Sequence, residues 1–194
     1  MNTLFIDTHN EIIKIILFKN GKVVDLKEKE SSMKHSVYTM PLIEEVLKNN
    51  NLDSNDINEI IVVNGPGSFT GVRIGVTIAK TYSYLLNIPI KVINMLEMKA
   101  IFVSGDKKII IEEEKNGKFI GIFDKNNKVI DDYFYLKNIE FEEYKNDNEI
   151  SIVDNIDYEK VYEYLKNKES INPHAVNPLY IKKIEVMKWL EKQY

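Results

Sequence analysis

The chain has 194 residues, enough for one domain or two small ones, and its 44% hydrophobic and 29% charged residues exclude a fibrous or wholly disordered protein. It has no cysteine, which excludes a disulfide scaffold, a thiol nucleophile and a cysteine-ligated metal site. The net charge is −4, and residues 131–159 hold ten acidic groups against two lysines, which disfavours a stand-alone nucleic-acid binder because such a stretch repels phosphate.

The first half of the chain alternates strand-like and helix-like segments. Asn20-Gly21, between two apolar runs, is a strong hairpin signal, and Pro41 either kinks the first helix or marks its start. The pattern predicts strands over 3–7, 11–18, 22–29, 60–64 and 88–93, and helices over 36–48, 70–86 and 96–103. This order predicts an α/β fold with helices covering a sheet.

The second half is more polar and more strand-like. A meander is predicted over 108–112, 118–124 and 128–136, then a solvated connection over 138–148, helices over 157–168 and 184–194, and an extended segment over 174–180. We expect a division near residue 103, with an N-terminal unit over 1–103 and a smaller C-terminal unit over 104–194.

The amino terminus lacks the basic flank, apolar run and cleavage site of a signal peptide. The longest apolar runs are too short to cross a bilayer. We therefore expect a soluble, cytoplasmic protein with no membrane partner.

The most informative segment, Asn64-Gly65-Pro66-Gly67-Ser68-Phe69-Thr70-Gly71-Val72-Arg73-Ile74-Gly75, links a predicted strand to a predicted helix. Exposed N–H groups at such a junction can bind phosphate, and the alternative is a tight turn capped by Ser68 or Thr70. The spacing matches neither a P-loop nor a dinucleotide-binding loop.

Small residues recur every fourth position in the helix that follows, at Gly71, Gly75 and Ala79. They leave room for close approach of another helix, either within the fold or in another subunit. The only arginine among 26 basic residues, Arg73, lies on the same helix and suggests a task that needs a planar, bidentate donor.

Other candidate chemistry is weak. Asp7-Thr8 resembles the first phosphate loop of actin-like ATPases and sugar kinases, but no glycine follows it and no second such loop occurs. The three histidines lack the spacing of a helical metal site, and the run 112–114 reads as a solvated stretch. We predict no catalytic residue and no metal ligand.

The long segment over 64–75 resembles the hallmark of the bacterial TsaB (YeaZ) family. The similarity extends to Phe5-Ile6-Asp7-Thr8, His35-Ser36, Ile88-Pro89 and Val176-Asn177-Pro178-Leu179-Tyr180-Ile181. It is dense over residues 1–100 and thin over 101–175.

This resemblance implies an actin/Hsp70-like (ASKHA) α/β fold of two ribonuclease-H-like subdomains, the second reduced because the chain is short for the family. It also implies a non-catalytic scaffold in the threonylcarbamoylation of N6 of adenosine 37 in tRNAs that read codons starting with A. The implied partners are a TsaD-like paralogue, a TsaE-like ATPase and, as an alternative, a second copy, with tRNA bound only through the complex. No cofactor of its own is implied, and ATP would bind at a shared interface.

The resemblance also assigns residues to two roles. The implied partner interface comprises Met40, Ile43, Leu47, Gly71, Arg73, Gly75, Ala79 and Tyr82. The motif loop, structural or a degenerate phosphate loop, comprises Asp7, Thr8, Gly65, Pro66, Gly67, Ser68, Phe69 and Thr70. The rival hypothesis is an actin-like ATPase or small-molecule kinase. A third hypothesis, a peptidase, is not supported, because the sequence contains no nucleophile–base pair.

Overall fold

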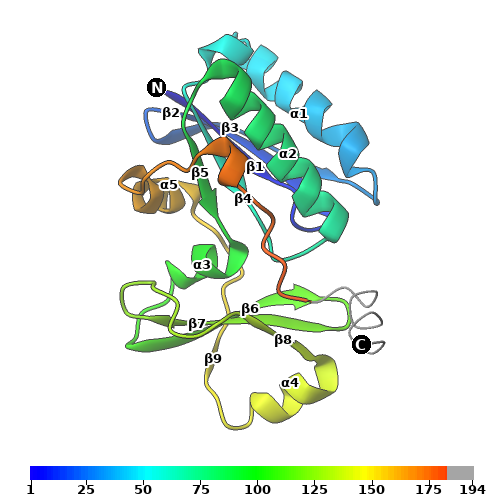
Figure 1. The fold of residues 1–194 in the computed structure, drawn as a ribbon, viewed down its shortest axis with the longest axis vertical. Helices are drawn as coiled ribbons and strands as arrows, with labels where there is room; N and C mark the ends of the chain where they lie inside the picture. The colour runs from blue at the N-terminus through cyan, green and yellow to red at the C-terminus, as the bar shows by residue number, and fades with distance from the viewer. Residues whose placement is uncertain (183–194) are drawn as a thin grey trace.

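Two separate β-sheets organise the chain in a computed structural model that describes residues 1–182 (Figure 1). The first sheet has the strand order β3-β2-β1-β4-β5, in which β1 runs antiparallel to β2 and parallel to β4, and β4 runs parallel to β5. Its strands are β1 (Asn2–Asp7), β2 (Ile12–Lys19), β3 (Lys22–Glu30), β4 (Glu59–Val63) and β5 (Ile90–Ile93).

Local sequence explains these strands. Every residue of β4 is buried, as expected for a parallel strand covered on both faces, whereas the edge strand β3 alternates between exposed and half-buried residues. The predicted hairpin between β2 and β3 is confirmed: Asn20 and Gly21 adopt φ values of 52° and 82° at its turn.

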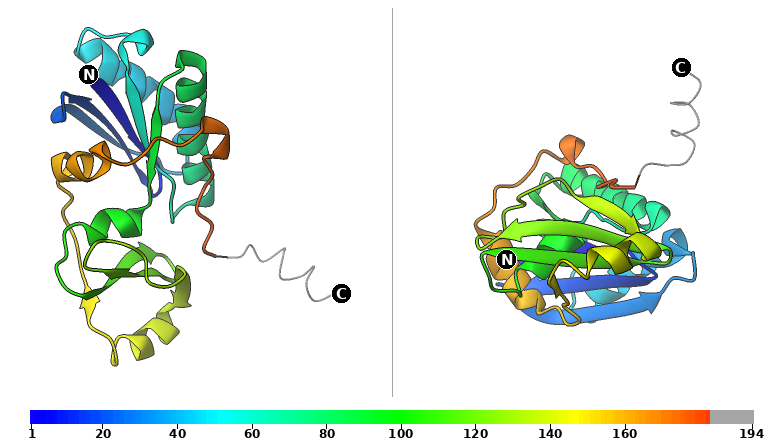
Figure 2. Two further views of the ribbon diagram at one scale, coloured as in Figure 1. Left: turned by 60° about the vertical axis from the view of Figure 1, so that its left-hand side comes forward. Right: turned by 90° about the horizontal axis from the view of Figure 1, so that it is seen from below.

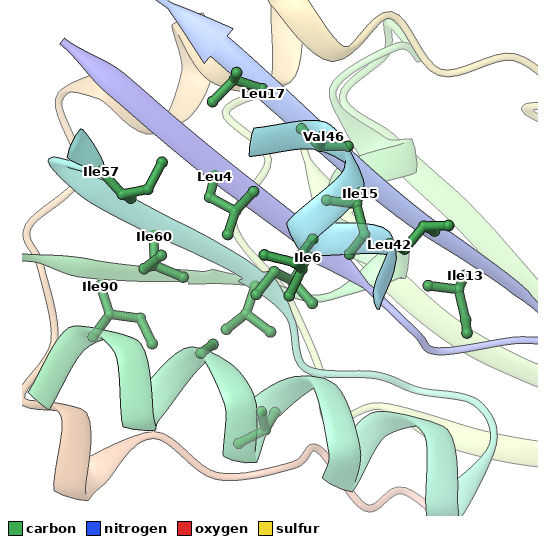
Figure 3. Close-up of a cluster of buried hydrophobic side chains, with 14 of the residues drawn as sticks. Leu4, Ile6, Ile13, Ile15, Leu17, Leu42, Val46, Ile57, Ile60 and Ile90 are labelled. Atoms are coloured by element: carbon green, nitrogen blue, oxygen red, sulfur yellow. The ribbon is translucent and has the colours of Figure 1, made fainter. Parts of the chain in front are cut away.

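Helices cover both faces of the first sheet. On one face α1 (His35–Asn49) and α2 (Phe69–Leu86) enclose the core shown in Figure 3, in which Leu4, Ile15 and Ile60 are fully buried. On the other face lie α3 (Met95–Ala100) and α5 (Tyr158–Lys166). Pro41 lies inside α1, so it does not mark the start of that helix.

The second sheet has the order β8-β7-β6-β9 and packs against the opposite side of α3, so that α3 lies between the two sheets (Figure 2). Met95 and Met98 of α3 contact the first core, whereas Leu96 and Ala100 contact the second. The remaining elements are β6 (Lys107–Glu114), β7 (Gly117–Asp124), β8 (Phe134–Lys137), α4 (Asn138–Tyr144) and β9 (Ile150–Ser151).

Two predictions for the second half were wrong. The expected strand over 128–136 is reduced to β8, because Val129 and Ile130 are exposed and only Val129 bridges to β7. The expected connection over 138–148 contains α4, because Phe141 is buried against the sheet and Glu140 bonds the backbone at the helix start. The helix predicted over 184–194 lies outside the described residues.

After α5 the chain returns along the first sheet as a segment over residues 172–182, which we term the C-terminal strap. It begins with a short 3-10 turn, Pro173–Ala175, buries Val176 in the first core, and then runs past α2 to the level of the second sheet (Figure 2). The domain division at residue 103 stays a prediction. Within residues 1–182, none of the helices combines the length and apolar character needed to span a bilayer.

Candidate functional site

A cleft of about 660 Å³ opens where the first sheet meets the second. Five segments form its walls: the turn after β1, the loop that leads into α2, the end of β6 with the turn that follows it, β7 and the C-terminal strap. Its lining residues are His9, Asn10, Glu11, Pro66, Gly67, Ser68, Phe69, Glu112, Glu113, Glu114, Lys115, Phe119, Leu179, Tyr180, Ile181 and Lys182. This volume is in the range of small-molecule sites.

The two motif segments meet directly at the floor of this cleft. The backbone N–H of Ser68 donates to the carbonyl of His9 at 2.6 Å, and the Thr8 hydroxyl donates to the carbonyl of Gly71 at 2.7 Å. A Cβ at Gly67 would lie 2.1 Å from the His9 carbonyl oxygen, so only glycine permits this approach. The loop is therefore closed onto the turn that follows β1.

The same loop is held from two other sides. The Gly65 carbonyl accepts the N–H of Met95 at 2.8 Å, and the Asn64 carbonyl accepts the N–H of Leu179 at 2.7 Å. The predicted cap is confirmed, because the Ser68 hydroxyl accepts the N–H of Gly71 at 3.2 Å.

A buried charge cluster joins the two sheets beside the loop. His9 Nδ1 lies 2.6 Å from Asp7 Oδ1, and His9 Nε2 lies 3.3 Å from Glu112 Oε1. Glu112 Oε2 lies 2.7 Å from Lys99 Nζ, which also donates to the carbonyl of Ile111. Asp7 ends β1 of the first sheet, His9 lies in the turn that follows, and Glu112 belongs to β6 of the second sheet. The cluster is therefore an electrostatic link between the two sheets.

Burial lowers the pKa of His9, but the charges of Asp7 and Glu112 and their hydrogen bonds outweigh it and raise that pKa to about 9. Burial opposes ionisation of Glu112 as well, yet His9 and Lys99 bring its pKa below the usual value. The cluster is therefore an imidazolium held between two carboxylates at neutral pH, with a lysine beyond the second.

The single arginine lies beside the cleft and contacts two of the residues that line it. The Arg73 guanidinium lies 3.8 Å from the centroid of the Phe69 ring, and its Nε donates to the Tyr180 hydroxyl at 2.6 Å. Phe69 and Tyr180 pack with ring centroids 5.0 Å apart. This planar contact between α2 and the C-terminal strap is one that lysine cannot reproduce.

The eight residues predicted for a partner interface fall into two groups. Ile43, Leu47 and Ala79 are buried in the first core, and Gly71 and Gly75 pack against Thr8, so this part of the small-residue stripe makes an internal contact. Met40 and Arg73 are exposed, and Tyr82 is half-buried. An interface on these helices stays a prediction.

Sequence reasoning missed the charge cluster. The run over 112–114 was expected to be solvated, but Glu112 is buried because strand alternation in β6 turns it inward, while Glu113 is exposed. His35 is the first residue of α1, one position before the start predicted at residue 36, and the N-cap residue Lys34 makes no side-chain cap bond. Among residues 1–182, no three His, Cys, Asp or Glu side chains are arranged to hold a metal ion.

Comparison with known proteins gives concordant results. Residues 28–110 match the family model of TsaD, a tRNA N6-adenosine threonylcarbamoyltransferase. The chain is 40% identical over 100 residues to the Bacillus subtilis tRNA threonylcarbamoyladenosine biosynthesis protein TsaB, covering 52% of this chain and 44% of that protein. It thus matches less than half the length of that relative.

Two further similarities each cover 92% of the chain. A Mycoplasma pneumoniae protein, the MG208 homolog, is 30% identical over 196 residues, which is 92% of this chain and 94% of that one. The solved structure of YeaZ from Pseudomonas aeruginosa superposes with a TM-score of 0.72 at 14% identity, covering 92% of this chain and 100% of that one.

The sheet order, the second sheet beyond α3 and the cleft between them define an actin-like (ASKHA) fold, as the resemblance implied. The segment that matches the family model, residues 28–110, includes the motif loop. The chain belongs to the TsaB (YeaZ) family.

Proposed function

We propose that this chain is an accessory subunit in tRNA threonylcarbamoyladenosine biosynthesis in the bacterial cytoplasm. In this role it binds a TsaD-like paralogue, together with a TsaE-like ATPase, and supports threonylcarbamoyl transfer to N6 of adenosine 37 without catalysing that transfer. The pathway is inferred from the names of the chain's relatives. The accessory role is inferred from the structure of the cleft.

The observation that carries the accessory role is the closure of the motif loop. A phosphate-binding loop presents free N–H groups to its ligand, whereas the N–H of Ser68 already donates to the His9 carbonyl and Gly67 packs on the same backbone. The Asp7 Oδ1 atom is engaged by His9. These contacts support a scaffold derived from a nucleotide-binding fold.

Charge argues against the alternative, an actin-like ATPase or small-molecule kinase. The cleft lining includes four glutamates, at position 11 and over 112–114, against Lys115, Lys182 and the imidazolium of His9. An acidic wall disfavours a nucleoside triphosphate. ATP therefore belongs, in this proposal, at a surface shared with the partner, and tRNA contacts the complex through the partner.

The surface we assign to the partner is the outer side of α1 and α2, which lie next to each other on one face of the first sheet (Figure 1). It carries exposed apolar side chains on α1, with Val37 56% and Met40 37% exposed. Arg73 is exposed on α2. Exposed apolar groups grouped on helices are typical of an interaction surface.

Light scattering on a sizing column tests the proposal with this chain, the TsaD-like protein of the same organism, and their mixture, each with and without ATP. A stoichiometric complex is expected, and Met40→Lys should weaken its affinity at least about tenfold because a charge enters an apolar contact. The matched control is Ile139→Lys, which also places a lysine at an exposed apolar position of a helix, 80% exposed, but on α4 and away from α1 and α2.

Separate peaks in every mixture would overturn the proposal. A concentration-dependent dimer of the chain alone, lost in Met40→Lys, would assign this surface to a second copy instead. Tight magnesium-dependent ATP binding by the isolated chain, measured by calorimetry, would favour the ATPase.

A further inference from the structure

Arg73 is the only arginine of the chain, and its guanidinium is held in one orientation at the surface of α2. The guanidinium lies 3.8 Å from the centroid of the Phe69 ring and 5.6 Å from that of the Tyr180 ring. Its Nε donates to the Tyr180 hydroxyl at 2.6 Å, yet the side chain is exposed. An exposed arginine that is already oriented loses little side-chain entropy when it binds.

These contacts leave most of the donors of Arg73 unused. Stacking engages the face of the guanidinium, whereas its N–H groups lie in its plane. Within residues 1–182, the only hydrogen bond that the side chain donates is the one from Nε. The terminal nitrogens Nη1 and Nη2 can therefore donate side by side to an anion that offers two oxygens.

The unused donors lie at the end of α2 that contacts the start of α1. A Cβ at Gly71 would lie 3.0 Å from His35 Nε2, so the first turns of the two helices are in contact. Arg73 closely follows Gly71 in sequence, and the exposed Val37 closely follows His35. Arg73 is therefore part of the surface that we assign to the partner.

We propose that Arg73 binds a carboxylate of the partner protein, and that Phe69 and Tyr180 are positioning residues that orient its guanidinium for this contact. The inference rests on the proposed function, because it gives the chemistry of that interface. A carboxylate accepts two parallel N–H bonds from a guanidinium. A phosphate backbone fits less well, because it needs several cations in a row, whereas Val37, Met40 and Phe69 expose apolar surface at this end of the helices.

Phenylglyoxal labelling of the full chain tests whether the donors are available, because this reagent modifies arginine and the chain has only Arg73. Peptide mass mapping should show rapid labelling of Arg73 in the chain alone. Saturating TsaD-like protein should slow the labelling at least about fivefold, because the contact buries the guanidinium, and tRNA alone should not. An unreactive Arg73 in the chain alone would overturn the proposal, and protection by tRNA alone would assign the donors to a phosphate instead.

Calorimetry of the complex tests the geometry of the contact. Arg73→Lys should weaken the affinity at least about tenfold although the positive charge is kept, since an ammonium cannot form the paired bonds. The control is Lys125→Gln, which removes a positive charge from an exposed turn after β7, away from α1 and α2, and should leave the affinity unchanged. An Arg73→Lys chain that binds as tightly as the parent would overturn the proposal.

Tyr180→Phe tests the positioning role, because it keeps the ring and removes the hydroxyl that accepts from Nε. It should weaken the affinity about threefold in the parent chain and leave it unchanged in Arg73→Gln. Equal losses in both backgrounds would show that Tyr180 acts through the fold and would overturn this role. Circular dichroism of every variant should match that of the parent.

The same measurements separate this inference from the proposed function. If the parent chain forms no complex with the TsaD-like protein, both are wrong. If it forms a complex in which Arg73 is labelled as fast as in the chain alone, only this inference is wrong.

Discussion

At the scale of single residues, His9 is the most informative side chain of the described structure. It is 2% exposed, and its ring nitrogens face one carboxylate from each side of the cleft. A buried neutral histidine would stabilise the fold by packing alone, but this one does so as a cation. Its contribution must therefore depend on pH.

We predict that the stability difference between the parent chain and His9→Gln falls as pH rises. Because the folded-state pKa of His9 is raised from 6.5 to about 9, its stabilisation is fully present below the unfolded value and is lost as pH passes the folded value. The difference should decrease by about 3 kcal/mol between about pH 6 and about pH 9.5.

Urea unfolding across this range measures the effect. His174→Gln is the control, since His174 is exposed and should leave the pH dependence of the parent unchanged. A constant difference between the parent and His9→Gln would show that His9 contributes through shape and not through charge.

At the scale of elements, the fit of α2 onto the end of β1 depends on two glycines. A Cβ at Gly75 would lie 2.3 Å from Thr8 Oγ1, and one at Gly71 would lie 2.2 Å from the Thr8 carbonyl oxygen. The helix thus approaches the backbone of the turn more closely than any side chain would allow. This close approach also fixes the position of the motif loop, which leads into α2.

Gly75→Ala should therefore destabilise the chain by about 1–3 kcal/mol through overpacking, although alanine favours a helix by about 1 kcal/mol. Thr77→Ala, at an exposed position of α2, should change stability little. The free energy of unfolding in urea is the measurement. Combining Gly75→Ala with Thr8→Ala should cost less than the two single changes added together.

A stabilised Gly75→Ala chain would contradict this reading. It would mean that α2 can move away from β1 and that the small residues serve another contact.

At the scale of the whole molecule, the two sheets are joined by few contacts other than α3. The charge cluster through Glu112 is one of these, and the C-terminal strap is another (Figure 1). Because the cleft lies between these contacts, its width depends on how firmly they hold. A substitution in either contact should therefore change the dynamics of parts of the chain that are distant from the substituted residue.

Glu112→Gln should loosen the junction, because it leaves Lys99 and His9 without a shared anion in a buried site. We expect a loss on the order of 3 kcal/mol and faster hydrogen–deuterium exchange in α3 and in the loop before α2. Glu113→Gln is the matched control, since this neighbouring glutamate is exposed and, among residues 1–182, pairs only with Lys118. Equal exchange in the two variants would show that the cluster does not hold the sheets together.

Much of the first sheet was predictable because its signals are local. The Asn20-Gly21 turn, the Ser68 cap and the apolar runs of β1, β2 and β4 each depend on residues within a few positions of one another. The second half was less predictable. The sequence anticipated β6 and β7, but β8 and β9 are only four and two residues long. The helix α4 forms because Phe141 is buried against the second sheet, a contact that the local pattern does not reveal.

The sequence by itself determined the α/β class, the motif loop and the family, since all of these depend on periodicity and on a continuous run of residues. Only the tertiary structure decided that Gly71 and Gly75 pack inside the fold, that Arg73 bonds Tyr180, and that His9 lies between Asp7 and Glu112. The physical reason is separation along the sequence: Arg73 and Tyr180 are 107 residues apart, and His9 and Glu112 are 103 residues apart. Contacts and charge pairs between residues so far apart in sequence form only when the chain has folded.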